Sequence, residues 1–103
     1  MSDQLNRLKV ELDNGQAQLF DVRELNEWND GHLAQASFIP LSELRVGLEP
    51  ENKDISLKTY LYCRSGQRVH MAKPILESMG YTNVVALSEG FEDLADYGFE
   101  TEG

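Results

Sequence analysis

The spacing of hydrophobic residues along the chain changes several times, which predicts helices that alternate with short strands. Leucines three and four residues apart near the start indicate a helix that ends at Asn14-Gly15. Helical spacing recurs in four later segments, which are 24–31, 41–48 with Ser42 as its cap, 67–79 closed by Gly80, and 90–98. Short apolar or extended runs between them predict strands at 18–22, 37–40, 56–63 and 83–87.

These predicted strands lack a clean alternation of polar and apolar residues, which is typical of strands that are covered on both faces. The pattern predicts an α/β fold with a small, mostly parallel sheet flanked by helices on both faces. A chain of 103 residues is expected to form one domain, 1–103. In such folds the site lies where the carboxyl end of a strand turns into the next helix. Cys63 is expected at that position.

Composition narrows the classes of partner. The formal net charge of −9 disfavours nucleic acid, because an acidic surface repels phosphate backbones. No apolar run approaches the roughly 20 residues of a membrane helix, and the N-terminus lacks the apolar core of a signal peptide. We therefore expect no membrane partner and a cytoplasmic location, where thiols stay reduced. Two histidines and one cysteine stand at no usual metal-ligand spacing, so we expect no metal and no cofactor.

The segment YLYCRSGQR, residues 60–68, places the only cysteine in a basic part of this acidic chain. No Asp or Glu occurs between residues 55 and 76, whereas residues 89–103 contain six acidic residues and no basic one. A strand-turn-helix gathers backbone N–H groups around one point, which favours an anion or a thiolate. Lowering a thiol pKa by two units takes roughly 2.7 kcal/mol, and a helix terminus supplies about 0.3–2 kcal/mol. The arginines or the N–H groups must supply the rest.

A lone cysteine after an apolar strand is more often a small buried hydrophobic residue than a nucleophile. Here the neighbouring sequence favours a reactive thiol. Arg64 and Arg68 flank the turn, Gly66 allows a tight backbone within it, and a helix is predicted to follow.

Three blocks of the sequence resemble single-domain rhodanese-like sulfurtransferases. LFDVRELNEWNDGHLAQASFIPLSEL, residues 19–44, is similar to the family's series of Asp-Val-Arg, Glu-aromatic, Gly-His-hydrophobic and Ile-Pro. YCRSGQR, residues 62–68, is similar to its active loop, and LESMGYTNVVALSEGF, residues 76–91, has Gly80 and Gly90 in family-like places. The chain departs from the family pattern at Ala34-Gln35, at Phe38 and at Glu89.

The resemblance implies that Cys63 is a catalytic nucleophile that carries a sulfur atom as a persulfide. The donor would be a small anion such as thiosulfate, and the acceptor a thiol, cyanide or another protein. The substrate would be held by the loop residues Arg64, Ser65, Gly66, Gln67 and Arg68. We expect structural roles near the site for Asp21, Arg23 and His32: an ion pair or a turn brace for the first two and hydrogen bonding for His32.

The sequence leaves three alternative functions open. A persulfide relay for a specific partner protein would differ only in its acceptor. A cysteine phosphatase or arsenate reductase on the same fold needs Cys-x5-Arg, whereas here Arg68 follows Cys63 after four residues and the next position is Val69. The smaller ring suits a sulfur atom better than a phosphate. A non-enzymatic interaction module would not need the thiol and two arginines.

Overall fold

The computed structural model describes residues 3–51 and 54–103 of the chain. The expected domain of 1–103 also includes residues 1–2 and 52–53, which lie outside the described residues. The elements follow the order α1 (Asp3–Asp13), β1 (Ala17–Asp21), α2 (Leu25–Asp30), β2 (His32–Leu33), β3 (Ala36–Phe38), α3 (Leu41–Arg45), β4 (Lys58–Tyr62), α4 (Val69–Ser78), β5 (Val84–Ala86), α5 (Phe91–Tyr97) and β6 (Thr101–Glu102).

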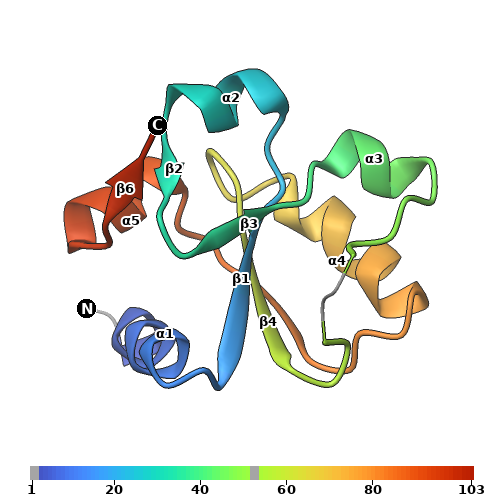
Figure 1. Cartoon of the computed structure of the whole chain (residues 1–103), viewed down its shortest axis with the longest axis horizontal. Coiled ribbons are helices and arrows are strands. Elements are labelled where there is room, and N and C mark those ends of the chain that lie inside the picture. Colours follow the sequence, from blue (N-terminus) through green and yellow to red (C-terminus); the bar gives the residue numbers. More distant parts are fainter. Residues whose placement is uncertain (1–2, 52–53) are drawn as a thin grey trace.

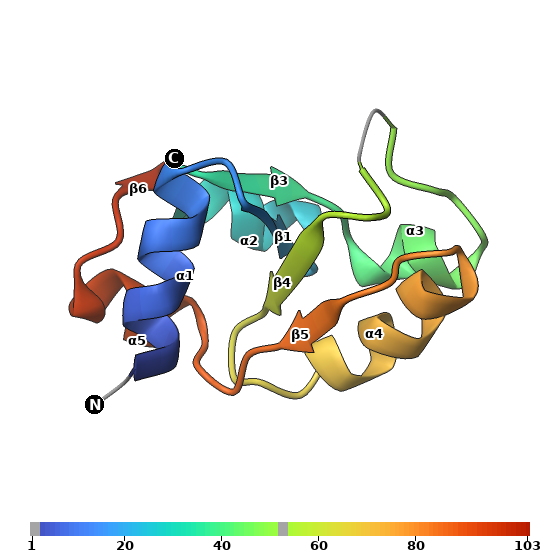
Figure 2. The same cartoon turned by 90° about the horizontal axis from the view of Figure 1, so that it is seen from below.

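Four strands form a parallel sheet in the order β3-β1-β4-β5, with β1 and β4 at its centre (Figure 1). Helices cover both faces, with α1 and α5 on one side and α3 and α4 on the other (Figure 2). Successive residues of β4 therefore enter different cores: Tyr60 and Tyr62 pack with α1 and α5, whereas Leu61 packs with α3 and α4. The predicted α/β class is confirmed.

Two helices differ from the prediction by two residues or more at one end. Helix α3 starts at Leu41 behind an extended Pro40, and the Ser42 hydroxyl donates to Glu24 Oε1 at 2.6 Å instead of capping the helix. The same helix stops at Arg45, three residues before the predicted end, and Gly47 then takes a positive φ of 88°. Helix α4 starts at Val69 rather than at residue 67, because the turn after β4 runs on through Arg68.

The β2–β6 pair is absent from the sequence prediction, because each strand has two residues and shows no periodicity. The antiparallel pairing sets Leu33 opposite Thr101 and His32 opposite Glu102. It joins the C-terminal residues to the segment that leaves α2, close to the carboxyl edge of the main sheet (Figure 1). Within the described ranges, no helix has the length and apolar character needed to cross a membrane.

Candidate active site

Cys63 directly follows β4 at the carboxyl edge of the sheet, as expected from the sequence. Its backbone is fixed by α5, since the Phe91 N–H donates to the Cys63 carbonyl at 2.8 Å. The preceding carbonyl, that of Tyr62, accepts from the Val22 N–H at 3.1 Å. Helix α5 and the end of β1 thus hold the backbone at the point where the loop begins.

The loop from Arg64 to Arg68 bends around the Cys63 sulfur. The Gly66 N–H donates to Sγ at 3.2 Å, and the whole residue is buried. Burial raises the pKa of the Cys63 thiol, but the backbone N–H groups of Val69, Ser65, Gly66 and Arg68 lower it by more, so the net pKa lies below its ordinary value. Of the two sources considered from the sequence, the N–H groups are the main cause of this lowered pKa. The Arg68 guanidinium also interacts electrostatically with Cys63.

Two glycines let another segment pack directly against this loop. Gly66 has φ +81°, and a Cβ there would lie 2.5 Å from the carbonyl oxygen of Ser88. A Cβ on Gly90 would lie 1.8 Å from the carbonyl oxygen of Arg64. Residues 88–90 therefore support the loop from outside. In the sequence, Gly90 stands out only as a glycine in a family-like position. Its close approach to the Arg64 carbonyl depends on the fold and could not be predicted from the sequence.

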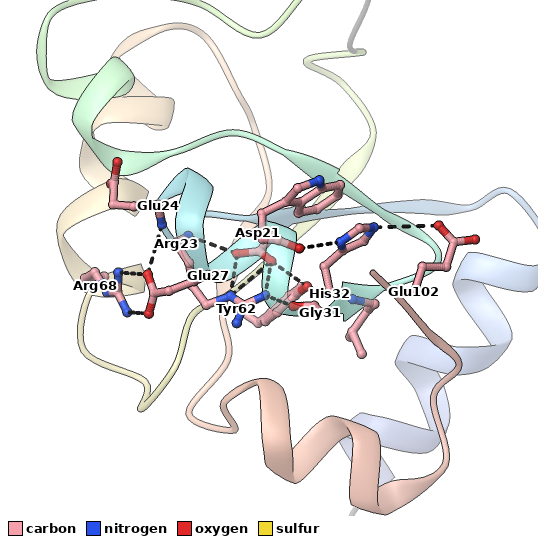
Figure 3. Close-up of polar contacts among 11 residues, drawn as sticks. Asp21, Arg23, Glu24, Glu27, Gly31, His32, Tyr62, Arg68 and Glu102 are labelled. Carbon is pink, nitrogen blue, oxygen red and sulfur yellow. Dashed lines mark hydrogen bonds and ion pairs between the residues drawn. The ribbon is translucent and has the colours of Figure 1, made fainter.

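Arg68 closes the loop through an ion pair with Glu27 of helix α2 (Figure 3). Its Nη1 and Nη2 donate to the two carboxylate oxygens at 2.7 and 2.8 Å, and the Glu24 N–H donates to the same carboxylate at 3.0 Å. The hydrogen bonds from Arg68 are the main reason that the pKa of Glu27 falls from its usual 4.5 to about 2. Both terminal nitrogens of Arg68 are thus engaged within the protein.

Asp21 and Arg23 form the ion pair expected from the sequence, fully inside the protein (Figure 3). Arg23 Nη2 donates to Asp21 Oδ2 at 2.8 Å and to the Gly31 carbonyl at 2.7 Å, and the Tyr62 hydroxyl donates to Asp21 at 2.7 Å. Burial is the largest cause of the strongly raised pKa of Tyr62, and the Asp21 charge adds to it. The network links the ends of β1 and β4 to the turn after α2.

His32 lies at the opposite end of this network from Arg68 (Figure 3). Its Nδ1 is 2.8 Å from the Trp28 carbonyl oxygen, and its ring stacks on the Trp28 ring with centroids 3.4 Å apart. Its Nε2 is 3.6 Å from a carboxylate oxygen of Glu102. These contacts hold the imidazole between α2 and β6, away from the loop.

A pocket of about 280 Å³ opens beside the loop. Its lining consists of Arg23, Glu27, Asp30, Gly31, Arg64, Phe91 and Glu92. The buried Cys63 is not among these residues, but the adjoining Arg64 is. Ser65 and Gln67 are exposed on the loop and Gly66 is half-buried. Asp30, Phe91 and Glu92 were not predicted as site residues, because the folding of α2 and α5 onto one edge brings them there.

Residues 4–96 match the model of the rhodanese-like domain, and the chain belongs to this family. It is 33% identical over 75 residues to the thiosulfate sulfurtransferase PspE of Escherichia coli, covering 73% of this chain and 71% of that protein. It is 28% identical over 90 residues to the putative sulfur carrier protein YrkF of Bacillus subtilis, covering 86% of this chain and 48% of that protein. The uncharacterized protein YqhL of the same organism is 40% identical over 76 residues, covering 74% of this chain and 59% of that protein.

The human single-domain sulfurtransferase TSTD1 has a similar structure, with a TM-score of 0.78 and 28% identity. The match covers 89% of this chain and 92% of the human one. The chain spans about half the length of the putative sulfur carrier protein of Bacillus subtilis. Fold and family are therefore established, and they place the chain among rhodanese-like proteins that include named sulfurtransferases.

Replacing Glu27 with Gln should destabilise the protein by an amount that depends on pH. A carboxyl whose pKa is about 2 when folded and roughly 4.3 when unfolded stabilises the fold fully above the unfolded pKa. That contribution, on the order of 1–3 kcal/mol, is lost as the pH falls through the folded pKa. In urea unfolding, the difference in the free energy of unfolding between wild type and variant should therefore narrow from about pH 5 toward about pH 2.

Glu77→Gln makes the same charge change on an exposed residue of helix α4 and serves as the control. Its free energy of unfolding should differ little from that of the wild type at every pH. If the difference between Glu27→Gln and the wild type stays constant over the whole pH range, the Arg68 pair does not lower the pKa of Glu27 in solution.

Proposed function

We propose that this protein is a sulfurtransferase that moves a sulfane sulfur from a donor such as thiosulfate to a thiol or to cyanide through a persulfide on Cys63. The observation that carries the proposal is the loop that directs backbone N–H groups at one buried thiol. The same donors that favour the thiolate suit the terminal sulfur anion of a persulfide. Membership of the rhodanese-like family supports the assignment.

The proposed reaction has two displacement steps. The Cys63 thiolate attacks the outer sulfur of thiosulfate, the S–S bond of the donor breaks, and sulfite leaves with the bonding electrons. An acceptor nucleophile then attacks the terminal sulfur of the persulfide, and the Cys63 thiolate leaves into its shell of N–H groups. A neutral sulfur atom passes between nucleophiles, so no external oxidant or reductant is needed. The cytoplasm, which keeps thiols reduced, is the location that we propose.

The loop residues take different parts in this proposal. Arg64 is exposed and has no side-chain partner among residues 3–51 and 54–103, so its guanidinium is available to an anionic donor. Ser65, Gly66 and Gln67 contribute the curved backbone. Arg68 acts through its pair with Glu27, which holds the end of the loop. Asp21, Arg23 and His32 brace the surrounding turns.

A persulfide relay for a partner protein is the second candidate. It is favoured by the single cysteine of the chain, since no other thiol of the same chain can remove the sulfur from Cys63. The name of the Bacillus subtilis relative, a putative sulfur carrier, supports it as well. A phosphatase has no such support, because the arginine that would bind the phosphate is already paired with Glu27.

Incubation of the reduced protein with thiosulfate should add one sulfur atom to Cys63, visible by intact-protein mass spectrometry. Cyanide or a small thiol should then remove it. Cys63→Ser should acquire no sulfur, because an alcohol is a poor nucleophile without a base beside it. If neither thiosulfate nor a polysulfide loads a folded protein whose thiol reacts with an alkylating reagent, the proposed function is wrong.

Arg64→Ala and Arg68→Ala should differ in how they affect two donors. Arg64→Ala should raise the KM for thiosulfate about three- to fivefold, typical of an exposed ion pair, and leave a neutral persulfide donor nearly unchanged. Arg68→Ala should lower sulfur transfer from both donors alike, because it loosens the loop. A selective loss with thiosulfate in Arg68→Ala would instead assign donor binding to Arg68.

A further inference from the structure

The pocket beside the loop keeps three charged side chains free for a ligand. Two of its other charged groups are already neutralised within the protein, Arg23 by Asp21 and Glu27 by Arg68. The remaining ones are Arg64, Asp30 and Glu92. A molecule that enters the pocket therefore meets one uncompensated cation and two uncompensated carboxylates.

These three side chains come from three separate elements. Arg64 belongs to the loop, Asp30 is the last residue of α2, and Glu92 lies in the first turn of α5. All three are exposed, and none has a hydrogen-bond or ion-pair partner within 3–51 and 54–103. Only the packing of α2 and α5 around the loop brings opposite charges to one cavity.

The rest of the lining suits a short aliphatic chain. The half-buried Phe91 ring lies against the Arg23 guanidinium, which is 4.5 Å from its centroid. A Cβ on Gly31 would lie 3.4 Å from Phe91 Cζ, so the glycine backbone approaches the ring edge closely. The pocket thus combines an apolar wall with separate sites for a positive and a negative group.

We propose that this pocket selects the sulfur acceptor and favours small thiols that carry both an ammonium group and a carboxylate. The ammonium group pairs with Asp30 and Glu92, and the carboxylate pairs with Arg64. The inference rests on the proposed function, because it concerns the second half of that reaction. Arg64 directly follows Cys63 in the chain, which places a bound acceptor beside the loop that carries the sulfur.

The transfer step balances without a further reactant. The acceptor thiol gives its proton to water, and its sulfur attacks the terminal sulfur of the Cys63 persulfide. The bond between that sulfur and Sγ breaks, and Cys63 leaves as a thiolate held by the loop N–H groups. The product is the persulfide of the amino thiol.

Three thiols separate the contributions of the two charged groups. Cysteine carries both groups, cysteamine lacks the carboxylate, and 3-mercaptopropionate lacks the ammonium group. The protein is loaded with polysulfide, loading is checked by intact mass, and the rate constant for sulfur removal is measured with each thiol. For each thiol, the ratio of the rate constants of variant and wild type is compared. The intrinsic reactivity of the thiol cancels in this ratio, because the same nucleophile reacts with both proteins.

The double variant Asp30→Asn/Glu92→Gln should react roughly fivefold more slowly with cysteine and with cysteamine, since each exposed ion pair contributes a few-fold. With 3-mercaptopropionate it should react at least as fast as the wild type, because two repelling charges are gone. Glu77→Gln, far along α4 from the loop, should match the wild type with all three thiols. Equal losses with all three thiols, or no loss with cysteine, would overturn the proposal.

A binding measurement separates this inference from the proposed function. S-Methylcysteine cannot accept sulfur but keeps both charged groups, so it can be titrated into the reduced protein and followed by amide NMR shifts. Shifts at Gly31 and Phe91 that disappear in the double variant support the pocket, even in a protein that no donor loads. Failure to load would overturn the sulfurtransferase assignment, and absence of these shifts would overturn the acceptor pocket.

Discussion

The fold and the chemistry both depend on one constraint: the backbone N–H groups at the start of α4 need an acceptor, and the buried sulfur of Cys63 is that acceptor. A thiol in an apolar core would ordinarily become less acidic. Here the loop reverses that effect because its N–H groups converge on Sγ. The loop keeps this shape through contacts outside itself, namely the close approach of Gly66 to Ser88, that of Gly90 to Arg64, and the Arg68 pair with Glu27. Stability and reactivity therefore rest on the same few contacts.

The distribution of charge around the loop follows from this arrangement. The basic residues that stand out in the sequence are not all available to an anion. Lys58 pairs with Glu11 on α1, and Arg68 pairs with Glu27 on α2, so both cations already have a carboxylate partner within the protein. Arg64 is left facing a pocket that also contains Asp30 and Glu92. A pocket with one unpaired cation and two unpaired carboxylates suits a zwitterion such as the proposed amino thiol acceptor.

The sequence predicted those features of the fold that arise from local periodicity or from a recognisable motif. The four strands of the main sheet, the helices between them and the position of Cys63 after β4 are examples, and the family assignment is confirmed.

The β2–β6 pair was missed because its strands are too short to show a period. Asp30, Glu92 and the contact of Gly90 with the loop were missed because they depend on how α2 and α5 close on the same edge. Ser42 was misassigned as a cap because helix α3 already begins at Leu41 behind Pro40, which puts Ser42 inside the first turn, where its hydroxyl donates to Glu24. The roles of the loop residues and the cytoplasmic location stay predictions.

The most direct test of this account is the thiol pKa of Cys63 in the wild type and in Gly90→Ala, obtained from the pH dependence of its alkylation rate. A methyl group on Gly90 would overlap the Arg64 carbonyl oxygen, so the loop or residues 88–90 must shift, which disturbs the N–H groups around Sγ. Gly47→Ala places an alanine at a strained φ of +88° but meets no neighbouring atom, so it serves as the control for backbone strain away from the loop. We expect the Cys63 thiol of the wild type and of Gly47→Ala to titrate clearly below about 8.5, the pKa of a free cysteine, and that of Gly90→Ala to shift toward this value. Equal midpoints in the wild type and in folded Gly90→Ala, or a wild-type midpoint near about 8.5, would contradict this account.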